Sequence, residues 1–275
     1  MKASQLKSAH DTAVTAARAA GALMKKNFHE PKKVNEMTQH DIKLELDVRC
    51  QQLIEKKLAV AFPKIAVLGE EGETGDTGAE YRWVVDPIDG TVNYAYGIPH
   101  SCVSIALQGK AQSPKSQVKG RGSVTPDGYV TLVGVVYDPF VDELWTAQRG
   151  GKAFLNGRII SVSARALLNQ AIISVGFSKR TDTLNLMMPV LNRLIHRVRK
   201  VRIMGAAALA MTYVASGRLD AYLESGIRLW DIAAGGLILE CAGGDFCHQP
   251  VAGEYQTFSL VVNNGLLRKQ LQQLM

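Results

Sequence analysis

The 275-residue sequence contains few cysteines, few aromatic residues and no long uncharged apolar run. Its four cysteines, Cys50, Cys102, Cys241 and Cys247, form no C-x-x-C pair. This scattered arrangement favours reduced thiols in a cytosolic protein over a disulfide framework. His248 follows Cys247, but the spacing to Cys241 matches no common zinc finger, so we expect structural cysteines.

The apolar runs are all shorter than the roughly eighteen residues that a membrane-spanning helix requires. His10, Asp11 and Arg18 lie where a signal peptide would have its apolar centre, so this segment is predicted to remain as a helix. These features predict a cytoplasmic protein without a membrane partner. Hydrophobic residues at 47% and charged residues at 21% are typical of a globular protein and argue against disorder, collagen and coiled coil.

Acidic residues are the minority, with 25 Asp and Glu against 32 Lys and Arg, which gives a net charge of +7. This balance favours an anionic partner, either nucleic acid or a negatively charged small substrate. The basic residues gather in segments 110–121 and 193–202, but neither has the interleaved aromatic residues of a base-stacking surface. We interpret both segments as solvated faces, which disfavours a nucleic-acid partner.

The length predicts one large domain or two closely associated ones. Helical spacing of small and apolar residues predicts helices over residues 5–28 and about 43–62. Apolar runs predict strands at 65–68, 81–85, 101–107, 129–137 and 143–147, followed by a hairpin at 150–157 with an Asn-Gly turn. Residues 108–128 are predicted to form a long hairpin loop.

The second half alternates more regularly. Strands are predicted at 171–176, 201–203 and 221–223, and helices at 185–197, 206–216 and 230–241. Pro189 is tolerable in the first of these helices only within its first turn. Helices between strands predict a layered α+β or α/β class. We expect an N-terminal α+β part, residues 1–155, that carries metal-binding loops. A C-terminal α/β part, residues 156–275, would supply Asp231 and the substrate pocket.

The strongest chemical signal is the segment Asp86-Pro-Ile-Asp89-Gly-Thr, which follows an apolar strand. Pro87 fixes one φ and Gly90 permits a tight turn, so both carboxylates can converge beside the N–H groups of Gly90 and Thr91. Converging carboxylates suit Mg²⁺, Mn²⁺ or Ca²⁺, and exposed N–H groups suit phosphate. For this segment alone, an Asx-type turn is the better interpretation.

Two further acidic signals lie at element boundaries. Glu70 and Glu71 follow a strand, and Asp231 follows Trp230 at the start of a helix. Taken separately, the first pair is typical of solvated acids, and Asp231 is typical of a helix N-cap. Three acidic clusters at element boundaries of a basic protein are not expected by chance, and they indicate one shared site.

These segments resemble the inositol monophosphatase family of Mg²⁺-dependent, lithium-sensitive phosphatases. The family pattern of G-E-E, D-P-I-D-G-T and W-D-x-A-A-G stands at residues 69–71, 86–91 and 230–235, with matching order and intervals. The resemblance extends over nearly the whole chain. It implies the fold of inositol monophosphatase and fructose-1,6-bisphosphatase, with alternating helix and sheet layers, and it implies a homodimer.

The resemblance also implies a ligand set for two or three Mg²⁺ ions. Glu70, Asp86 and the Ile88 carbonyl would hold the first ion. Asp86, Asp89 and Asp231 would hold the second, so Asp86 would serve both. Glu70 would also reach a third ion through water. Hard cations with oxygen ligands are suited to hydrolysis of phosphate esters, because they activate water and neutralise developing charge.

In the same resemblance, phosphate rests on the Gly90 and Thr91 amides. A water molecule oriented by Glu70, Thr91 and Asp47 would attack phosphorus in line. Asp47 closes a segment that resembles the family's D-x-V-T-x-x-D, although Leu44 stands at the usual Thr position. An acid on a helix surface is therefore an open alternative for Asp47.

Glu224 matches the family position that accepts a hydrogen bond from a substrate hydroxyl, and Ala206 and Ala207 match the segment that lines the sugar side of the pocket. An isolated Glu at a strand end would otherwise be interpreted as solvent-facing. The implied function is Mg²⁺-dependent hydrolysis of a small phosphorylated polyol such as myo-inositol monophosphate. Alternatives are the same chemistry on fructose 1,6-bisphosphate, histidinol phosphate or 3′-phosphoadenosine 5′-phosphate, or a basic RNA-binding or regulatory protein on a phosphatase fold.

Overall fold

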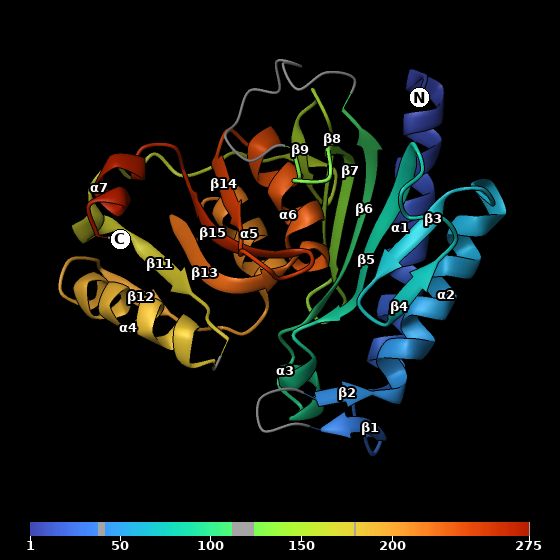
Figure 1. Cartoon of the computed structure of the whole chain (residues 1–275), viewed down its shortest axis with the longest axis horizontal. Helices are drawn as coiled ribbons and strands as arrows, with labels where there is room; N and C mark the ends of the chain where they lie inside the picture. Colours follow the sequence, from blue (N-terminus) through green and yellow to red (C-terminus); the bar gives the residue numbers. More distant parts are fainter. Residues whose placement is uncertain (38–41, 112–123, 179, 275) are drawn as a thin grey trace.

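The computed structural model describes residues 1–37, 42–111, 124–178 and 180–274. Helices alternate with two β-sheets in layers, which confirms the predicted layered α+β fold (Figure 1). In spatial order, the eight-stranded sheet contains β10 (Arg158–Ile159), β9 (Ala153–Leu155), β8 (Glu143–Gln148), β7 (Tyr129–Asp138), β6 (Cys102–Lys110), β5 (Tyr81–Asp89), β3 (Ala66–Gly69) and β4 (Gly72–Thr74).

The five-stranded sheet contains, in spatial order, β12 (Lys200–Arg202), β11 (Ile172–Val175), β13 (Ala221–Arg228), β15 (Thr257–Asn263) and β14 (Asp245–Pro250). A separate pair is formed by β1 (Val34–Met37) and β2 (Ile42–Leu44). Two short helical segments, α3 (Thr91–Ala95) and a 3₁₀ turn (Leu168–Gln170), connect strands.

Helices α1 (Ala3–Asn27) and α2 (Glu45–Ala61) cover one face of the eight-stranded sheet (Figure 1). The buried face of α1 consists mostly of small side chains, which allow the helix to lie close to the strands: Ala9, Ala13, Ala16, Ala17 and Ala20. Across the molecule, α4 (Thr181–Ile195) and α7 (Arg268–Gln272) pack through Met187, Leu194 and Leu271 on the outer face of the five-stranded sheet.

The middle layer consists of α5 (Ala207–Ala215) and α6 (Leu229–Cys241), which lie between the two sheets (Figure 1). Their buried side chains share one core with residues of both sheets, such as Val136 and Leu260. Gly134 of β7 lies against α6 so closely that a Cβ there would approach the Ala234 carbonyl oxygen to 2.7 Å. This core contains residues from both sides of the predicted boundary at residue 155. The division into residues 1–155 and 156–275 stays a prediction.

Several local predictions are confirmed. The turn of the β9–β10 hairpin has Asn156 and Gly157 at φ of 48° and 76°, the left-handed conformation that an Asn-Gly turn adopts. Strand β6 extends to Lys110 and β7 begins at Tyr129, while residues 112–123 of the predicted loop lie outside the described residues. In the described part of the chain, no helix combines the length and apolarity needed to cross a bilayer.

The prediction for Pro189 is wrong. Helix α4 begins at Thr181, four residues before the predicted start, so Pro189 lies in the helix interior. Proline removes the hydrogen bond to the Asn185 carbonyl, and burial of Met187 and Val190 on either side offsets that loss. Strands β14 and β15 were not predicted, because polar residues on their outer face obscure the apolar alternation.

Candidate active site

A cleft of about 510 Å³ opens where β5 ends, beside the beginnings of α5 and α6 and the ends of β11 and β13. All but one of the predicted site residues border it: Glu70, Asp86, Ile88, Asp89, Gly90, Thr91, Ala206, Ala207, Glu224 and Asp231. The exception is Asp47. Both sheets and both middle helices therefore contribute to one cavity.

Three carboxylates converge at the base of this cleft. Asp86, Asp89 and Asp231 each offer an oxygen, and these oxygens lie within 4.8 Å of one another. Asp86 and Asp89 are only 1% and 6% exposed. A β-bulge in β5 between these two aspartates interrupts its register with β6 and places both on the cleft side. Ile88 N–H also donates to Asp86 Oδ1 at 3.0 Å, so the predicted Asx-type turn exists within the carboxylate cluster.

Asp89 is fixed by the beginning of α5. The backbone N–H groups of Ala207 and Ala208 donate to its two carboxylate oxygens at 3.0 and 2.8 Å, and the Cys102 thiol lies 3.5 Å from Oδ2. A helix N-terminus stabilises an anion in this position. Burial nevertheless raises the pKa of Asp89 to about 6, and the amide hydrogen bonds only partly oppose that rise.

Asp231 belongs to the first turn of α6 and bonds to the backbone before it. The Arg228 N–H donates to Asp231 Oδ2 at 2.8 Å, so Asp231 caps α6 from inside its first turn. Burial and the nearby Asp89 raise its pKa to about 7. Capping and a place in the carboxylate cluster are thus compatible in one side chain.

Glu70 joins the cluster from the end of β3. Burial raises its pKa well above the usual range, and repulsion from Asp231 and Asp47 raises it further. Asp86 behaves in the same way, because burial acts together with repulsion from Glu70 and Asp89. Several acids in one poorly solvated cleft therefore favour a positive ion between them, and their oxygen donors suit a hard divalent cation.

The protein supplies little positive charge of its own here. Among the described residues that border the cleft, Arg228 is the only basic one. Its Nη1 donates to the Tyr255 carbonyl at 2.9 Å and to the Thr257 hydroxyl at 2.5 Å, and neither partner is acidic. Arg228 lowers the pKa of Asp231 only in part, so the cluster keeps oxygen donors that can hold a metal ion.

The turn after Asp89 requires glycine. Gly90 has φ of 88°, and a Cβ there would meet the backbone oxygens of His100 at 2.9 Å and Gly205 at 3.1 Å. Thr91 then begins α3, and its hydroxyl donates to the Ile88 carbonyl at 2.9 Å. The close approach keeps this turn against the cleft, as the predicted phosphate site requires.

Asp47 and Glu224 are not the solvent-facing acids of their alternative interpretations. Asp47 is buried in the first turn of α2, where Leu44 N–H donates to Oδ2 at 2.7 Å, so it is not a helix-surface acid. It raises the pKa of Glu70 but does not border the cleft. Glu224 borders the cleft from β13, and burial, with repulsion from Asp231, raises its pKa to about 8.

The sequence and fold comparisons agree with this geometry. The model of the inositol monophosphatase family matches residues 5–114 and 127–274. The chain belongs to the inositol monophosphatase family. It is 38% identical over 240 residues to the Nus factor SuhB of Pseudomonas aeruginosa, covering 84% of this chain and 82% of that protein. It is also 38% identical over 239 residues to inositol monophosphatase 1 of Solanum lycopersicum, covering 84% and 81%.

Solved structures of inositol monophosphatase relatives share the fold. The extragenic suppressor protein suhB of Bartonella henselae superposes with a TM-score of 0.83 at 31% identity, covering 96% of each chain. The inositol monophosphatase of Anabaena gives 0.79 at 32% identity, covering 98% of this chain and 96% of that one. Family membership supports a phosphatase hydrolase with a small phosphorylated substrate, and members are generally metal-dependent.

Some residues of this inositol monophosphatase-family site were not predicted from the sequence. Cys102 contacts Asp89, and Asn93 Nδ2 joins α3 to the segment before α5 by donating to the His100 and Met204 carbonyls at 2.9 and 2.8 Å. Tyr222 donates to Glu224. Each contact joins residues that lie far apart in the sequence or alternate on a strand, so no local sequence motif predicts it.

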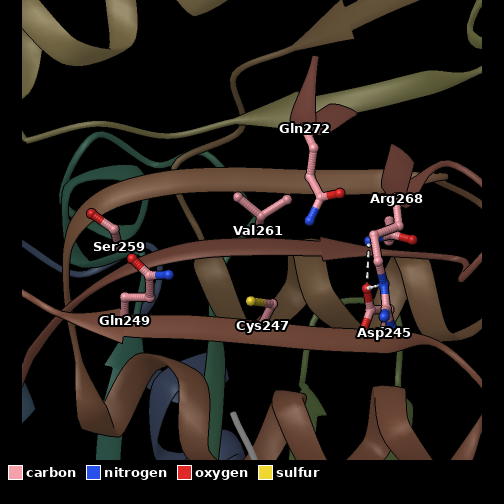
Figure 2. Close-up of a pocket in the computed structure, with 8 residues that line it drawn as sticks. Asp245, Cys247, Gln249, Ser259, Val261, Arg268 and Gln272 are labelled. Atoms are coloured by element: carbon pink, nitrogen blue, oxygen red, sulfur yellow. Dashed lines mark hydrogen bonds and ion pairs between the residues drawn. The ribbon is translucent and has the colours of Figure 1, made fainter. Parts of the chain in front are cut away.

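A second cavity, of about 190 Å³, lies on the outer face of β14 and β15 (Figure 2). Its buried acid, Asp245, forms an ion pair with Arg268, and Asn263 also donates to it at 3.2 Å. Cys247 and Val261 lie between this ion pair and the far end of the cavity (Figure 2). The charge of Asp245 is already neutralised, so this cavity lacks the unbalanced carboxylates of the first cleft.

Proposed function

We propose that this chain is a Mg²⁺-dependent phosphomonoesterase of small phosphorylated polyols, with myo-inositol monophosphate as the first candidate substrate. The observation that carries the proposal is the convergence of Asp86, Asp89 and Asp231 beside the Gly90 turn. Mg²⁺ binds through carboxylates together with substrate phosphate, and such a site needs an open side. The cleft supplies that open side above buried carboxylates.

In this proposal Glu70, Asp86 and the Ile88 carbonyl would hold a first ion, and Asp86, Asp89 and Asp231 would hold a second. Glu70 would also reach a third ion through water. When bound, Mg²⁺ lowers the pKa of a coordinated water and neutralises charge on the phosphate. The hydrogen bonds of Asp89 to α5 and of Asp231 to the backbone of Arg228 keep these oxygens aimed at one point.

The remaining residues bind phosphate and orient the water. The amides of Gly90 and Thr91 hold the phosphate oxygens, because the turn presents this backbone to the cleft. The Glu70 carboxylate and the Thr91 hydroxyl orient the attacking water. Asp47 acts through Glu70, since it lies close enough to raise the pKa of that acid and yet does not border the cleft.

The polyol is placed beside the start of α5 and the Glu224 carboxyl group. Ala206 and Ala207 leave room for a ring, and Glu224 accepts a hydrogen bond from a ring hydroxyl. Fructose 1,6-bisphosphate, histidinol phosphate and 3′-phosphoadenosine 5′-phosphate are alternative substrates for the same metal site. Phosphate release from all four compounds, with and without Mg²⁺, tests the proposal; no Mg²⁺-dependent release from any of them would reject it.

The role of Asp86 can be tested within this assay. Asp86→Asn is expected to lower kcat more than a hundredfold at saturating Mg²⁺, because one residue serves two ions. Asp138→Asn is a matched control: Asp138 is equally buried, and burial likewise raises its pKa, but it does not border the cleft. Activity of Asp86→Asn within about tenfold of wild type, a cost of about 1.4 kcal/mol, would rule out the shared role.

A second candidate function rests on the basic segment that follows α4. Arg197, Lys200 and Arg202 are exposed as predicted, Arg199 between them is exposed too, and in the described part of the chain none of the four forms an ion pair. Some relatives are named Nus factor SuhB. We therefore propose RNA binding by this surface as the alternative. Salt-dependent binding of RNA, lost when these residues become Glu while phosphatase activity persists, would support it.

We also propose a cytoplasmic homodimer. Tyr96 is 74% exposed, and Ile98 and Ile203 are also exposed, next to the contact of Asn93 with the Met204 carbonyl. Exposed apolar residues gathered in this way are typical of an interface. Light scattering should give a dimer mass, and Tyr96→Lys should shift it toward the monomer.

A further inference from the structure

The carboxylate of Glu224 contacts two neighbours that the proposed mechanism does not use. The Tyr222 hydroxyl donates to Glu224 Oε2. Gly176, which directly follows β11, lies against the same carboxylate: a Cβ at this position would lie 2.1 Å from Oε2, 2.5 Å from Cδ and 3.0 Å from Oε1 of Glu224. The nearest atoms to that Cβ all belong to Glu224, so the absence of a side chain at position 176 makes room for this one carboxylate.

The sheet explains why these three residues meet. Tyr222 and Glu224 are alternate residues of β13 and so point to the same face, and both border the cleft. Strands β11 and β13 run parallel, with Val175 beside Leu223. Gly176, the residue after the end of β11, therefore lies beside Glu224. Its N–H donates to the Leu223 carbonyl at 2.8 Å.

Tyr222 is well suited to hold a carboxylate in place. It is 3% exposed and packed in the core shared by the two sheets, so its hydroxyl cannot move freely. Burial, together with repulsion from Asp231 and Asp89, raises the pKa of Glu224. The same repulsion favours an orientation in which the Glu224 carboxyl group is turned away from the cluster. The hydroxyl occupies Oε2, and this leaves Oε1 to accept a hydrogen bond from a ligand in the cleft.

We propose that Tyr222 and Gly176 are positioning residues that fix the Glu224 carboxylate as the acceptor for a substrate hydroxyl. Tyr222 supplies a hydrogen bond that sets the orientation of the carboxylate, and Gly176 supplies the space that it occupies. Selectivity for phosphate esters of polyols over esters without hydroxyls then depends on three residues rather than one. This inference rests on the proposed function, because it concerns the substrate side of the same cleft.

The test compares two substrates in wild type and two variants. Tyr222→Phe removes only the hydroxyl, and Gly176→Ala pushes the end of a flexible side chain without changing the φ requirement. Both should lower kcat/KM for myo-inositol monophosphate about tenfold, mainly through KM, and leave p-nitrophenyl phosphate within twofold. Tyr129→Phe is the control: it removes a buried tyrosine hydroxyl on β7, which bonds to the Thr77 and Ala79 carbonyls away from the cleft. It should leave both substrates unchanged.

A double-mutant cycle separates positioning from a general effect on structure. If Tyr222 acts through Glu224, Tyr222→Phe should cost less than twofold on myo-inositol monophosphate in a Glu224→Gln background, where the oriented carboxylate is gone. Equal losses in both backgrounds would overturn the inference. So would equal losses on the two substrates, or an unchanged KM for myo-inositol monophosphate in Tyr222→Phe.

The outcome for the proposed function is read separately. Wild-type protein that releases no phosphate from any substrate with Mg²⁺ contradicts the proposed function, and that result is obtained before any variant is compared. If Gly176→Ala does not fold, Tyr222→Phe and the cycle still decide the question. Wild-type activity on both substrates with a Tyr222→Phe enzyme indistinguishable from wild type rejects the positioning role alone.

Discussion

Removing the charge of Asp89 should change how the stability of the metal-free protein depends on pH. Burial raises the pKa of Asp89 from 3.8 to about 6. Between these values the unfolded chain has lost a proton that the folded chain still holds. The contribution of Asp89 to stability is therefore complete below pH 3.8 and is lost as pH rises through 6. At about 1.4 kcal/mol for each pH unit, the loss is about 3 kcal/mol.

The Asp89→Asn variant lacks this pH-dependent loss of stability, but its side chain makes weaker hydrogen bonds to the beginning of α5. Both oxygens of Asp89 accept N–H groups, from Ala207 and Ala208. An amide has only one oxygen, so one of these hydrogen bonds is lost at every pH, at a cost of about 1–3 kcal/mol. The variant should be less stable than wild type at pH 4.5, and by pH 8 the difference should have shifted by about 2 kcal/mol in its favour, because part of the loss in wild type has already occurred at pH 4.5.

Urea denaturation in EDTA at pH 4.5, 6 and 8 measures this shift, and the same series with Mg²⁺ measures metal binding. Asp138→Asn is again the control, because burial also raises the pKa of Asp138 to about 6. Both variants should show the pH shift, whereas only Asp89→Asn should lose stabilisation by Mg²⁺. A free-energy difference between Asp89→Asn and wild type that is the same at pH 4.5 and 8 would refute the reasoning.

Three further outcomes are expected. Li⁺ should compete for the position formed by Asp86, Asp89 and Asp231, so that inhibition deepens as Mg²⁺ fills the first site; activity unaffected by tens of millimolar Li⁺, roughly where weak hard-cation sites compete, would contradict this. Glu224→Gln should lower kcat/KM for myo-inositol monophosphate by about tenfold and nearly spare p-nitrophenyl phosphate, because leaving a buried hydrogen-bonding group without its proper partner costs about 1–3 kcal/mol. Burial lowers the pKa of His100, so the free energy of unfolding of wild type should fall as pH falls below about 6.5. His100→Phe lacks this loss, so urea denaturation should show that its stability relative to wild type is greater at pH 5 than at pH 7.

The site could be predicted from the sequence where its geometry is local. The turn at Gly90 and the capping contact of Asp231 were predicted because each forms within a few residues of its own motif, whereas the bulge between Asp86 and Asp89 was not predicted. The family pattern then joined these motifs across the chain. The structure adds the geometry of the predicted cluster: an oxygen of each of the three carboxylates lies within 4.8 Å of the others.

Other features depend on packing between distant segments and left no local signal. Asp47 was open to a solvent-exposed interpretation because its helix pattern is ordinary, and only the packing of α2 against the sheet buries it. The position of Gly176 beside Glu224 follows from strand pairing, which sequence spacing does not reveal. Pro189 was misplaced because tertiary burial of its helix outweighs the local cost of proline.

The middle helices also determine when the site can form during folding. Asp86 and Asp231 are roughly 145 residues apart in the chain, and Asp231 belongs to α6, which lies in the core shared by both sheets. Closing a loop of that length places the contact among the slow, non-local steps of folding. A divalent ion that requires both aspartates therefore binds only the folded protein, and its binding shifts the folding equilibrium from intermediates toward the folded state. For a destabilised variant, the metal concentration in the cell would then set the amount of folded protein.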